Sequence, residues 1–268
     1  MNAPLLNTPM FPASLSVFFP AYNDAPALPA LIEKTFAVLE ECVADYEVIV
    51  VNDGSTDETG KVLEELRARF GDRLRIITHP KNRGYGGALR SGFAAATKEY
   101  VFYTDGDGQY DVGELPLLLA HATPEVGLVN GYKIQRQDPW HRIALGFLYN
   151  HFARFLFRVR LRDIDCDFRL IRRSLIEHFD LKSTSGTICV ELVKNIELYA
   201  PEVVEVPVHH YPRFHGRSQF FRVRSLMYTF VQLLRLYGRL VAAPALRTWA
   251  RRCGIRTRRP AAVGPDGR

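Results

Sequence analysis

The sequence predicts an α/β protein with a mostly parallel central sheet and helices on both of its faces. Short apolar runs rich in Val, Ile and Phe alternate with longer helical patterns through the first half of the 268 residues. This alternation is typical of sheets built from strand–helix–strand units. An apolar content of 47% also suffices for one substantial core with a small appendage.

The first half is expected to hold strands that are short and apolar, with a helical pattern between each strand and the next. In chain order the strands are Ser14–Pro20, Glu47–Asn52, Leu74–His79, Tyr100–Thr104 and Val126–Gly131. The helices are Ala27–Cys42, Asp57–Phe70, Gly86–Thr97 and Gly113–His121. Parallel strands end at one edge of a sheet, so the loops that follow them should meet where α/β proteins bind ligands.

The second half has fewer strands and two long helical candidates. His141–Arg162 is rich in Phe, Leu and Arg. Phe220–Val241 carries polar residues at three- and four-residue steps, which is typical of an amphipathic helix. Between them we expect a short strand at Phe168–Ile171, a helix at Cys189–Tyr199 and an edge strand at Glu202–His209.

Composition and charge narrow the possible partners. No run approaches the roughly 20 apolar residues needed to span a bilayer, and Met1–Pro12 lacks the features of a signal peptide. The four cysteines lack metal-ligand spacing, as expected of reduced thiols in a cytosolic protein. Residues 1–134 carry 11 Lys+Arg and 18 Asp+Glu, a net charge of −7, whereas residues 135–268 carry 24 and 11, a net charge of +13. The basic half predicts an anionic partner, either phosphates or a membrane surface, and no nucleic-acid recognition motif is present.

The stretch Tyr103–Asp111 says most about chemistry. Asp105 and Asp107 follow a buried strand and are separated by one glycine. Their carboxylates can converge on one Mg²⁺ or Mn²⁺ that keeps open positions for diphosphate oxygens, and both ions accept such ligands. Taken alone, the motif could equally be an acidic turn between a strand and a helix.

Three further loops follow the first three strands. Pro20–Asp24 comes after the first strand and Asn52–Asp57 after the second. In the latter, the carboxylate of Asp53 suits ribose hydroxyls or base N–H groups, although these residues would also make a simple turn and helix cap. The glycines of Asn82–Ala88, after the third strand, allow close backbone approach, and the helix start there favours anions.

Six motifs follow one another along the chain: Pro20–Asp24, Val51–Thr56, Asn82–Ala88, Asp105–Gln109, Asp163–Arg173 and His210–Ser218. Taken together, they resemble family 2 glycosyltransferases. Their order and spacing are similar to those of the polyprenyl-phosphate branch, which includes dolichyl-phosphate mannosyltransferases and undecaprenyl-phosphate sugar transferases. The resemblance covers roughly residues 14 to 240 and implies the nucleotide-diphospho-sugar transferase (GT-A) fold with C-terminal amphipathic helices.

The resemblance also implies roles for individual residues. The nucleotide and donor residues are Pro20, Tyr22, Asp24, Asp53, Gly84, Arg213 and Ser218. The metal ligands are Asp105, Asp107 and Gln109. The catalytic residues, which act on the metal, the phosphates or the acceptor, are Asp105, Asp107, Arg169, Asp163 and Asp165. For Asp163, Asp165 and Asp167 a solvated acidic turn is the alternative.

These features predict an inverting, metal-dependent hexosyltransferase that moves a sugar from a UDP- or GDP-linked donor to a polyprenyl phosphate. An acceptor phosphate is already anionic near neutral pH, so the reaction needs no strong base. One alternative is a soluble or glycan hydroxyl acceptor, which would need a general base such as Glu191 or Asp165. Another is a non-catalytic nucleotide-sugar-binding scaffold at the membrane, against which the pair Asp105 and Asp107 argues.

The expected organisation follows from this function. Residues 14–218 form the catalytic domain, with a nucleotide-binding half at 14–134 and an acceptor half at 135–218. Residues 219–243 form an amphipathic interfacial helix and 244–268 a basic disordered tail. The mixture of Arg and Phe in the two long helices favours contact with the inner face of the cell membrane, by a peripheral cytoplasmic protein. A core helix or a dimer interface is the alternative, and a homo-oligomer is left open.

Overall fold

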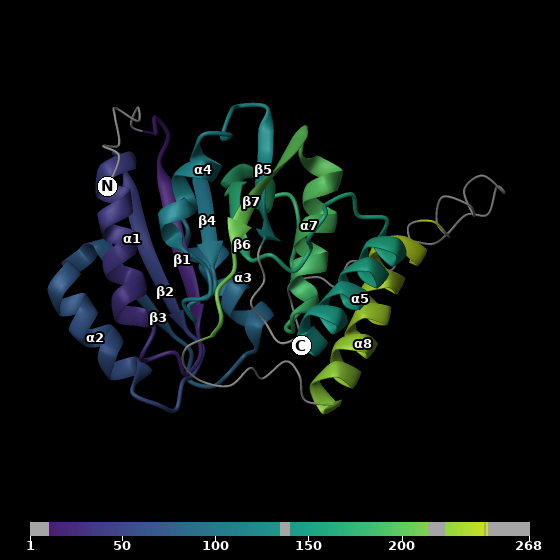
Figure 1. Cartoon of the computed structure of the whole chain (residues 1–268), viewed down its shortest axis with the longest axis horizontal. Helices are drawn as coiled ribbons and strands as arrows, with labels where there is room; N and C mark the ends of the chain where they lie inside the picture. Colours follow the sequence, from purple (N-terminus) through teal and green to yellow (C-terminus); the bar gives the residue numbers. More distant parts are fainter. Residues whose placement is uncertain (1–10, 135–139, 214–222, 244, 246–268) are drawn as a thin grey trace, which may run out of the picture.

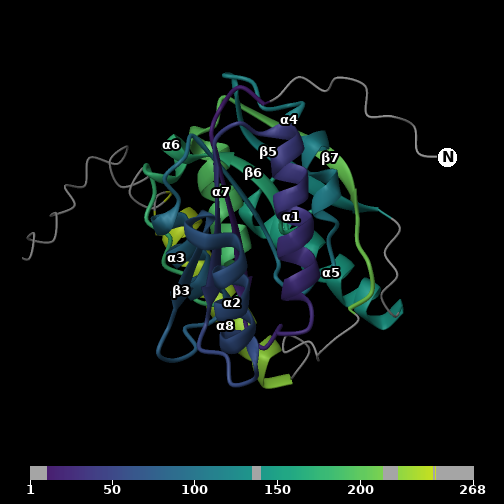
Figure 2. The same ribbon diagram turned by 90° about the vertical axis from the view of Figure 1, so that its left-hand side faces the viewer.

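The computed structural model describes residues 11–134, 140–213, 223–243 and 245. These residues form a seven-stranded sheet with helices on both faces (Figures 1 and 2), which confirms the predicted α/β class. Ser218, the start of the expected interfacial helix at 219–222 and the expected tail, apart from residue 245, lie outside the described residues.

The elements agree with the sequence prediction to within a few residues at most of their ends. The strands are β1 (Leu15–Ala21), β2 (Tyr46–Asn52), β3 (Leu74–Thr78), β4 (Tyr100–Thr104), β5 (Val126–Ile134), β6 (Phe168–Arg172) and β7 (Glu202–His209). The longer helices are α1 (Leu28–Cys42), α2 (Thr59–Phe70), α3 (Tyr85–Ala95), α5 (Trp140–Phe157), α7 (Thr187–Tyr199) and α8 (Val223–Tyr237). The short helical segments are η1 (Gly71–Arg73), η2 (Val112–Glu114), α4 (Leu115–Leu119), α6 (Arg173–Ile176) and η3 (Gly238–Ala242), the last of which is a π-helical turn.

The sheet has the strand order β3-β2-β1-β4-β6-β5-β7. Neighbouring strands are parallel except at β6, which runs antiparallel between β4 and β5. The sequence predicts β6 as a short strand but does not predict its position in the sheet. Because β6, from the expected acceptor half, lies between β4 and β5 of the expected nucleotide-binding half, the two halves share one continuous sheet.

Two apolar layers flank the sheet. Successive strand residues point to opposite faces. Phe19 belongs to the apolar layer that includes residues of α1, α2 and α4, whereas Phe18 belongs to the layer with residues of α3, α5, α7 and α8. The predicted helix His141–Arg162 ends earlier, at Phe157, because Arg158 adopts a left-handed φ of +53°. No helix among the described residues is long and apolar enough to cross a bilayer.

Candidate active site

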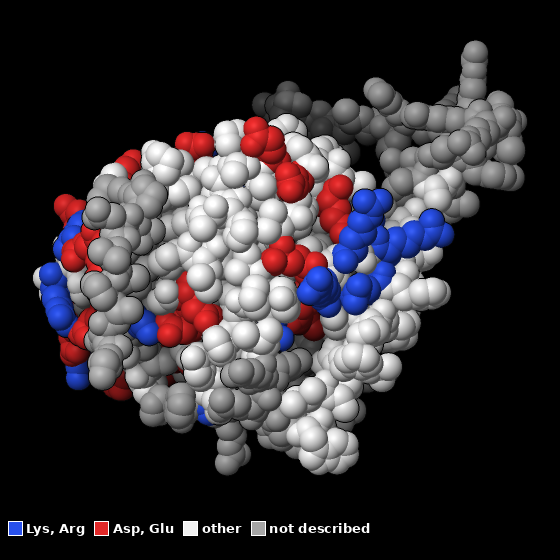
Figure 3. Space-filling view, turned by 45° about the horizontal axis from the view of Figure 1, so that its top comes forward, with Lys and Arg blue, Asp and Glu red and all other residues white. Residues whose placement is uncertain are grey.

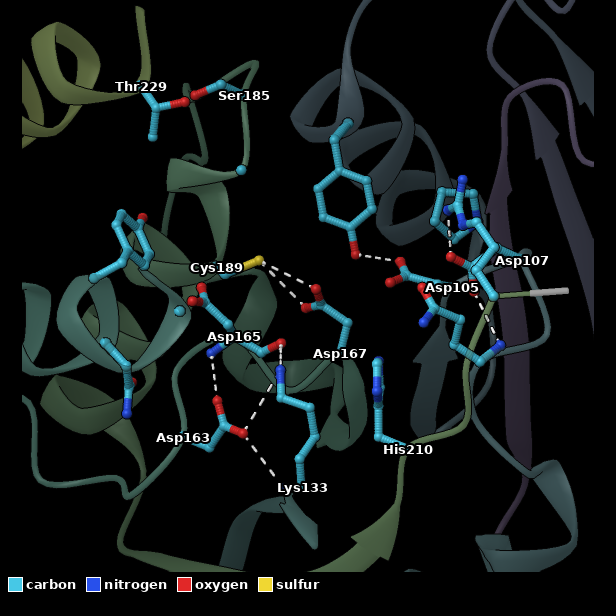
Figure 4. Close-up of a pocket in the computed structure, with 18 of the residues that line it drawn as sticks. Asp105, Asp107, Lys133, Asp163, Asp165, Asp167, Ser185, Cys189, His210 and Thr229 are labelled. Atoms are coloured by element: carbon cyan, nitrogen blue, oxygen red, sulfur yellow. Dashed lines mark hydrogen bonds and ion pairs between the residues drawn. The ribbon is translucent and has the colours of Figure 1, made fainter. Parts of the chain in front are cut away.

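A cavity of about 950 Å³ opens at the C-terminal edge of the parallel strands (Figure 4). The loops after β1, β2 and β4 line one end, which we call the donor end. Residues of β5, α5 and α8 line the other, which we call the acceptor end. The expected site residues that line this cavity are Pro20, Tyr22, Asp24, Asp53, Gly84, Asp105, Asp107, Gln109, Asp163, Asp165 and Arg213.

The loop after β1 shapes the donor end. Asn23 has a left-handed φ of +58°, and its side-chain oxygen accepts hydrogen bonds from the backbone N–H groups of Thr56 (2.8 Å) and Asp57 (3.3 Å). These bonds tie the loops after β1 and β2 together. Asp24 accepts a hydrogen bond from the backbone N–H of Tyr22 at 3.0 Å, and burial raises the pKa of this carboxyl to about 6.

Asp53 is buried at the end of β2 and held by groups from the third loop. Its Oδ1 lies 2.6 Å from Nδ1 of His79 and accepts the backbone N–H of Arg83 at 2.8 Å. Nε2 of His79 lies 2.8 Å from Oγ of Ser91 on α3. The sequence prediction treated His79 only as the end of a strand. The polar side chain that follows an apolar run at this edge was the available signal.

Asp105 and Asp107 lie in the turn after β4 and face the cavity (Figure 4). The hydroxyl of Tyr85 donates a hydrogen bond to Oδ1 of Asp105 at 2.7 Å, and the guanidinium of Arg213 pairs with Asp107. Burial raises the pKa of Asp105, and the negative charges of Asp167 and Asp107 raise it further. Carboxylates gathered in this way favour a bound cation.

The two carboxylates fit the divalent metal that the resemblance implies. Their oxygens are the hard ligands that Mg²⁺ and Mn²⁺ prefer. Among the residues that the structure describes, no group of three or more Asp, Glu, His or Cys side chains is arranged to hold a metal ion. Gln109 donates its backbone N–H to Asp107 at 3.0 Å and its side-chain amide to the carbonyl of Tyr211 at 3.0 Å, which fixes the turn.

The acceptor end combines carboxylates with basic side chains. Nζ of Lys133, on β5, donates to the carbonyl of Asp165 at 2.5 Å and lies 3.6 Å from Oδ2 of Asp163. Burial raises the pKa of Asp165 to about 7. Both acidic residues line the cavity and are partly buried, so they do not form a solvated turn. The exposed Arg162 also lines this end. Lys133 and Arg162 were not predicted, because no motif marks them.

Arg169 does not line the cavity, contrary to the expectation that it contacts a phosphate. Its side chain is 0% exposed, because β6 lies inside the sheet. Nε donates to Oδ1 of Asn130 at 2.7 Å and Nη1 to Oδ1 of Asp167 at 2.9 Å. Further hydrogen bonds go to the hydroxyl of Tyr103 and the carbonyl of Ile164. Arg169 therefore stabilises the loop that precedes β6.

Glu191, a candidate base for a hydroxyl acceptor, is also enclosed. It is 1% exposed and accepts hydrogen bonds from the backbone N–H groups of Lys182 and Ser183 and from the guanidinium of Arg239. It does not line the cavity, so it cannot take a proton from an acceptor bound there.

Comparison with known proteins agrees with this geometry. The model of glycosyl transferase family 2 matches residues 16–179. The undecaprenyl-phosphate 4-deoxy-4-formamido-L-arabinose transferase of Enterobacter sp. (strain 638) is 30% identical over 241 residues, which cover 85% of this chain and 72% of that protein.

Solved structures share the fold. Glucosyl-3-phosphoglycerate synthase from Mycobacterium tuberculosis, in complex with UDP, has a TM-score of 0.64 at 18% identity and covers 85% of this chain and 81% of its own. The mannosyltransferase PcManGT from Pyrobaculum calidifontis, in complex with GDP-Man and Mn²⁺, has a TM-score of 0.57 at 20% identity, with 87% and 68% covered. The predicted nucleotide-diphospho-sugar transferase fold is thereby confirmed.

Proposed function

Because the chain belongs to glycosyl transferase family 2, we propose that it transfers a sugar from a nucleotide-diphospho-sugar to a polyprenyl phosphate at a membrane surface, with inversion. The observation that carries the proposal is the cavity, which joins a carboxylate-lined donor end to an acceptor end where basic side chains lie beside carboxylates and apolar residues. The Enterobacter relative is, by its name, a transferase of undecaprenyl phosphate, which supports a lipid phosphate as acceptor.

The donor is a UDP- or GDP-linked sugar. Asp24 and Asp53 hold the nucleoside, and the fixed orientation of Asp53 suits hydrogen bonds from ribose hydroxyls or base N–H groups. The solved relatives bind UDP or GDP-Man, which supports a nucleotide donor without selecting its base.

The metal site of the proposal consists of Asp105 and Asp107, with Gln109 beside them. A bound Mg²⁺ or Mn²⁺ would neutralise the charge that develops on the leaving diphosphate. Mn²⁺ is present in several of the similar structures, which supports a divalent ion. Arg213 adds a planar guanidinium that can bind phosphate oxygens bidentately.

At the acceptor end the chain mainly orients an existing nucleophile. A phosphate monoester has its second pKa near ~6, so one of its oxygens can attack the anomeric carbon directly. A new carbon–oxygen bond forms to the acceptor while the bond to the diphosphate breaks, and the diphosphate leaves with the electron pair. Lys133 and Arg162 attract the acceptor phosphate and fix its position.

Membrane contact follows from the surface of α5 and α8. The rings of Phe152 and Phe230 stack at 6.4 Å between centroids, so the two helices lie side by side (Figure 1). Their exposed apolar residues are Trp140, Phe147, Leu148, Phe152, Phe155, Tyr228, Phe230, Val231 and Leu234. Figure 3 shows basic side chains gathered on the same side of the molecule. An apolar face beside basic residues suits the cytoplasmic surface of a membrane, where the protein binds peripherally.

The acceptor can be tested through Lys133. Loss of a charge-assisted contact costs roughly 1.5–3 kcal/mol, so Lys133→Gln should raise KM for undecaprenyl phosphate at least about tenfold and leave KM for the donor unchanged. Undecaprenol, which lacks the phosphate, should not be a substrate. Lys98→Gln is the matched control, because Lys98 pairs with Asp45 away from the cavity. Equal transfer to undecaprenol or to a glycan hydroxyl would overturn the proposal.

A further inference from the structure

We propose that Glu191 is a positioning residue for the donor end of the cavity. With Arg239 it holds the backbone of residues 182–184 against the glycine-rich loop that carries Tyr85, and Tyr85 in turn contacts Asp105. The inference rests on the proposed function, since it assumes that the donor end binds a nucleoside diphosphate.

The first step is the enclosure of Glu191 on α7. Its Oε2 accepts the backbone N–H of Ser183 at 2.8 Å and that of Lys182 at 3.2 Å, and its Oε1 accepts the latter at 3.1 Å. The guanidinium of Arg239, in η3, pairs with Oε1. A buried carboxylate needs such partners. Loss of the Arg239 charge should therefore disturb Glu191 and, through it, the position of the backbone at residues 182–183.

The second step is the close packing of this loop on the start of α3. The backbone N–H of Gly86 donates to the carbonyl of Thr184 at 3.0 Å. A methyl group added at Gly84 or Gly86 would overlap the carbonyls of Thr184 and Ser183, respectively. The two backbones thus touch with no space between them, and a displacement of one must displace the other.

The third step leads from the glycine-rich loop to the carboxylates. Tyr85 lies between Gly84 and Gly86, and its hydroxyl donates to Asp105 at 2.7 Å. On the other side, Oγ1 of Thr184 lies 3.4 Å from the hydroxyl of Tyr228 on α8. Figure 4 shows Ser185 and Thr229 facing each other at the same junction. The last helical segment therefore supports the donor carboxylates although it lies at the acceptor end.

The test compares Arg239→Gln with Arg235→Gln, one turn earlier on the same helical segment, where Arg235 is exposed. Binding of UDP and of GDP with Mn²⁺ is measured by calorimetry, and hydrogen exchange is measured for the peptide that contains Gly86. For Arg239→Gln and for Glu191→Gln we expect about tenfold weaker nucleotide binding, a matching rise in donor KM with kcat retained, and faster exchange at Gly86. Arg235→Gln should match the wild type.

The double variant should bind no more weakly than the weaker single variant, because both changes remove one interaction. A folded Arg239→Gln protein with wild-type nucleotide affinity and wild-type exchange at Gly86 would overturn the inference. If the wild type binds neither nucleotide, the proposed function fails instead. The exchange at Gly86 then still decides whether Glu191 positions the loop.

Discussion

The imidazole of His79 and the carboxylate of Asp53 form a buried pair, with Nδ1 of one 2.6 Å from Oδ1 of the other. Both side chains are 4% exposed. The other ring nitrogen of His79, Nε2, contacts Ser91 on α3. This contact fixes the imidazole, and the imidazole in turn fixes the orientation of Asp53. The donor end is therefore preorganised before a nucleotide enters.

Replacement of His79 should weaken nucleotide binding. Removing one partner of a buried hydrogen bond typically costs ~1–3 kcal/mol, so His79→Ala should raise the Kd for UDP or GDP about tenfold. His79→Asn, which keeps a donor, should lose less. His121→Ala, at an exposed position, is the control for calorimetric titration. An unchanged Kd in a folded His79→Ala protein would show that Asp53 does not depend on this pair.

Neutralising Asp107 should abolish transfer and preserve the fold. The substitution Asp107→Asn removes one of the two carboxylates at the metal site and the charge that pairs with Arg213. Thermal unfolding and label transfer are measured together. Asp111→Asn, which changes a carboxylate outside the cavity, should keep its activity. Turnover close to that of the wild type in Asp107→Asn would contradict the assignment of Asp107 as a metal ligand.

The pKa of Asp165 predicts a pH effect on stability. Folding raises this pKa from 3.8 to about 7, mainly through burial. Between about pH 4 and pH 7 the folded chain therefore binds more protons than the unfolded chain, and this carboxyl makes stability fall as the pH rises. The free energy of unfolding is measured with urea at pH 4.5 and 7.5. Relative to the wild type, Asp165→Asn should be more stable at pH 7.5 than at pH 4.5, by a few kcal/mol at most. The same difference at both pH values would contradict the shifted pKa.

The apolar face of α5 and α8 predicts vesicle binding. Phe155 is 85% exposed, so Phe155→Ser should cost the fold little. Inserting a Phe side chain into the interface is worth roughly 1.5–3 kcal/mol, and the variant should float with anionic vesicles about tenfold less. Leu117→Ser, on α4 at the opposite face of the sheet, is the matched control. Equal flotation of both variants would exclude the apolar face of α5 and α8 as the membrane-binding surface.

Much of the fold could be predicted from local sequence, because each strand of the first half is a short apolar run and each helix has its own helical pattern of apolar residues. The position of β6 could not be predicted, since five residues do not encode the strands they pair with. That position explains the error at Arg169, which pairs in register with Tyr103 and Asn130 inside the sheet. His79 and Lys133 escaped prediction for another reason: only the tertiary fold brings His79 against Asp53 and Lys133 to the wall of the cavity.

A transfer assay with the purified wild-type chain tests the central claim most directly. Radiolabelled UDP- and GDP-sugars are offered with undecaprenyl or dolichyl phosphate and with Mg²⁺ or Mn²⁺, and label is counted in the organic phase. The account predicts that label enters the organic phase and that a chelator prevents this. A folded protein that leaves all label in water across the whole panel would contradict it.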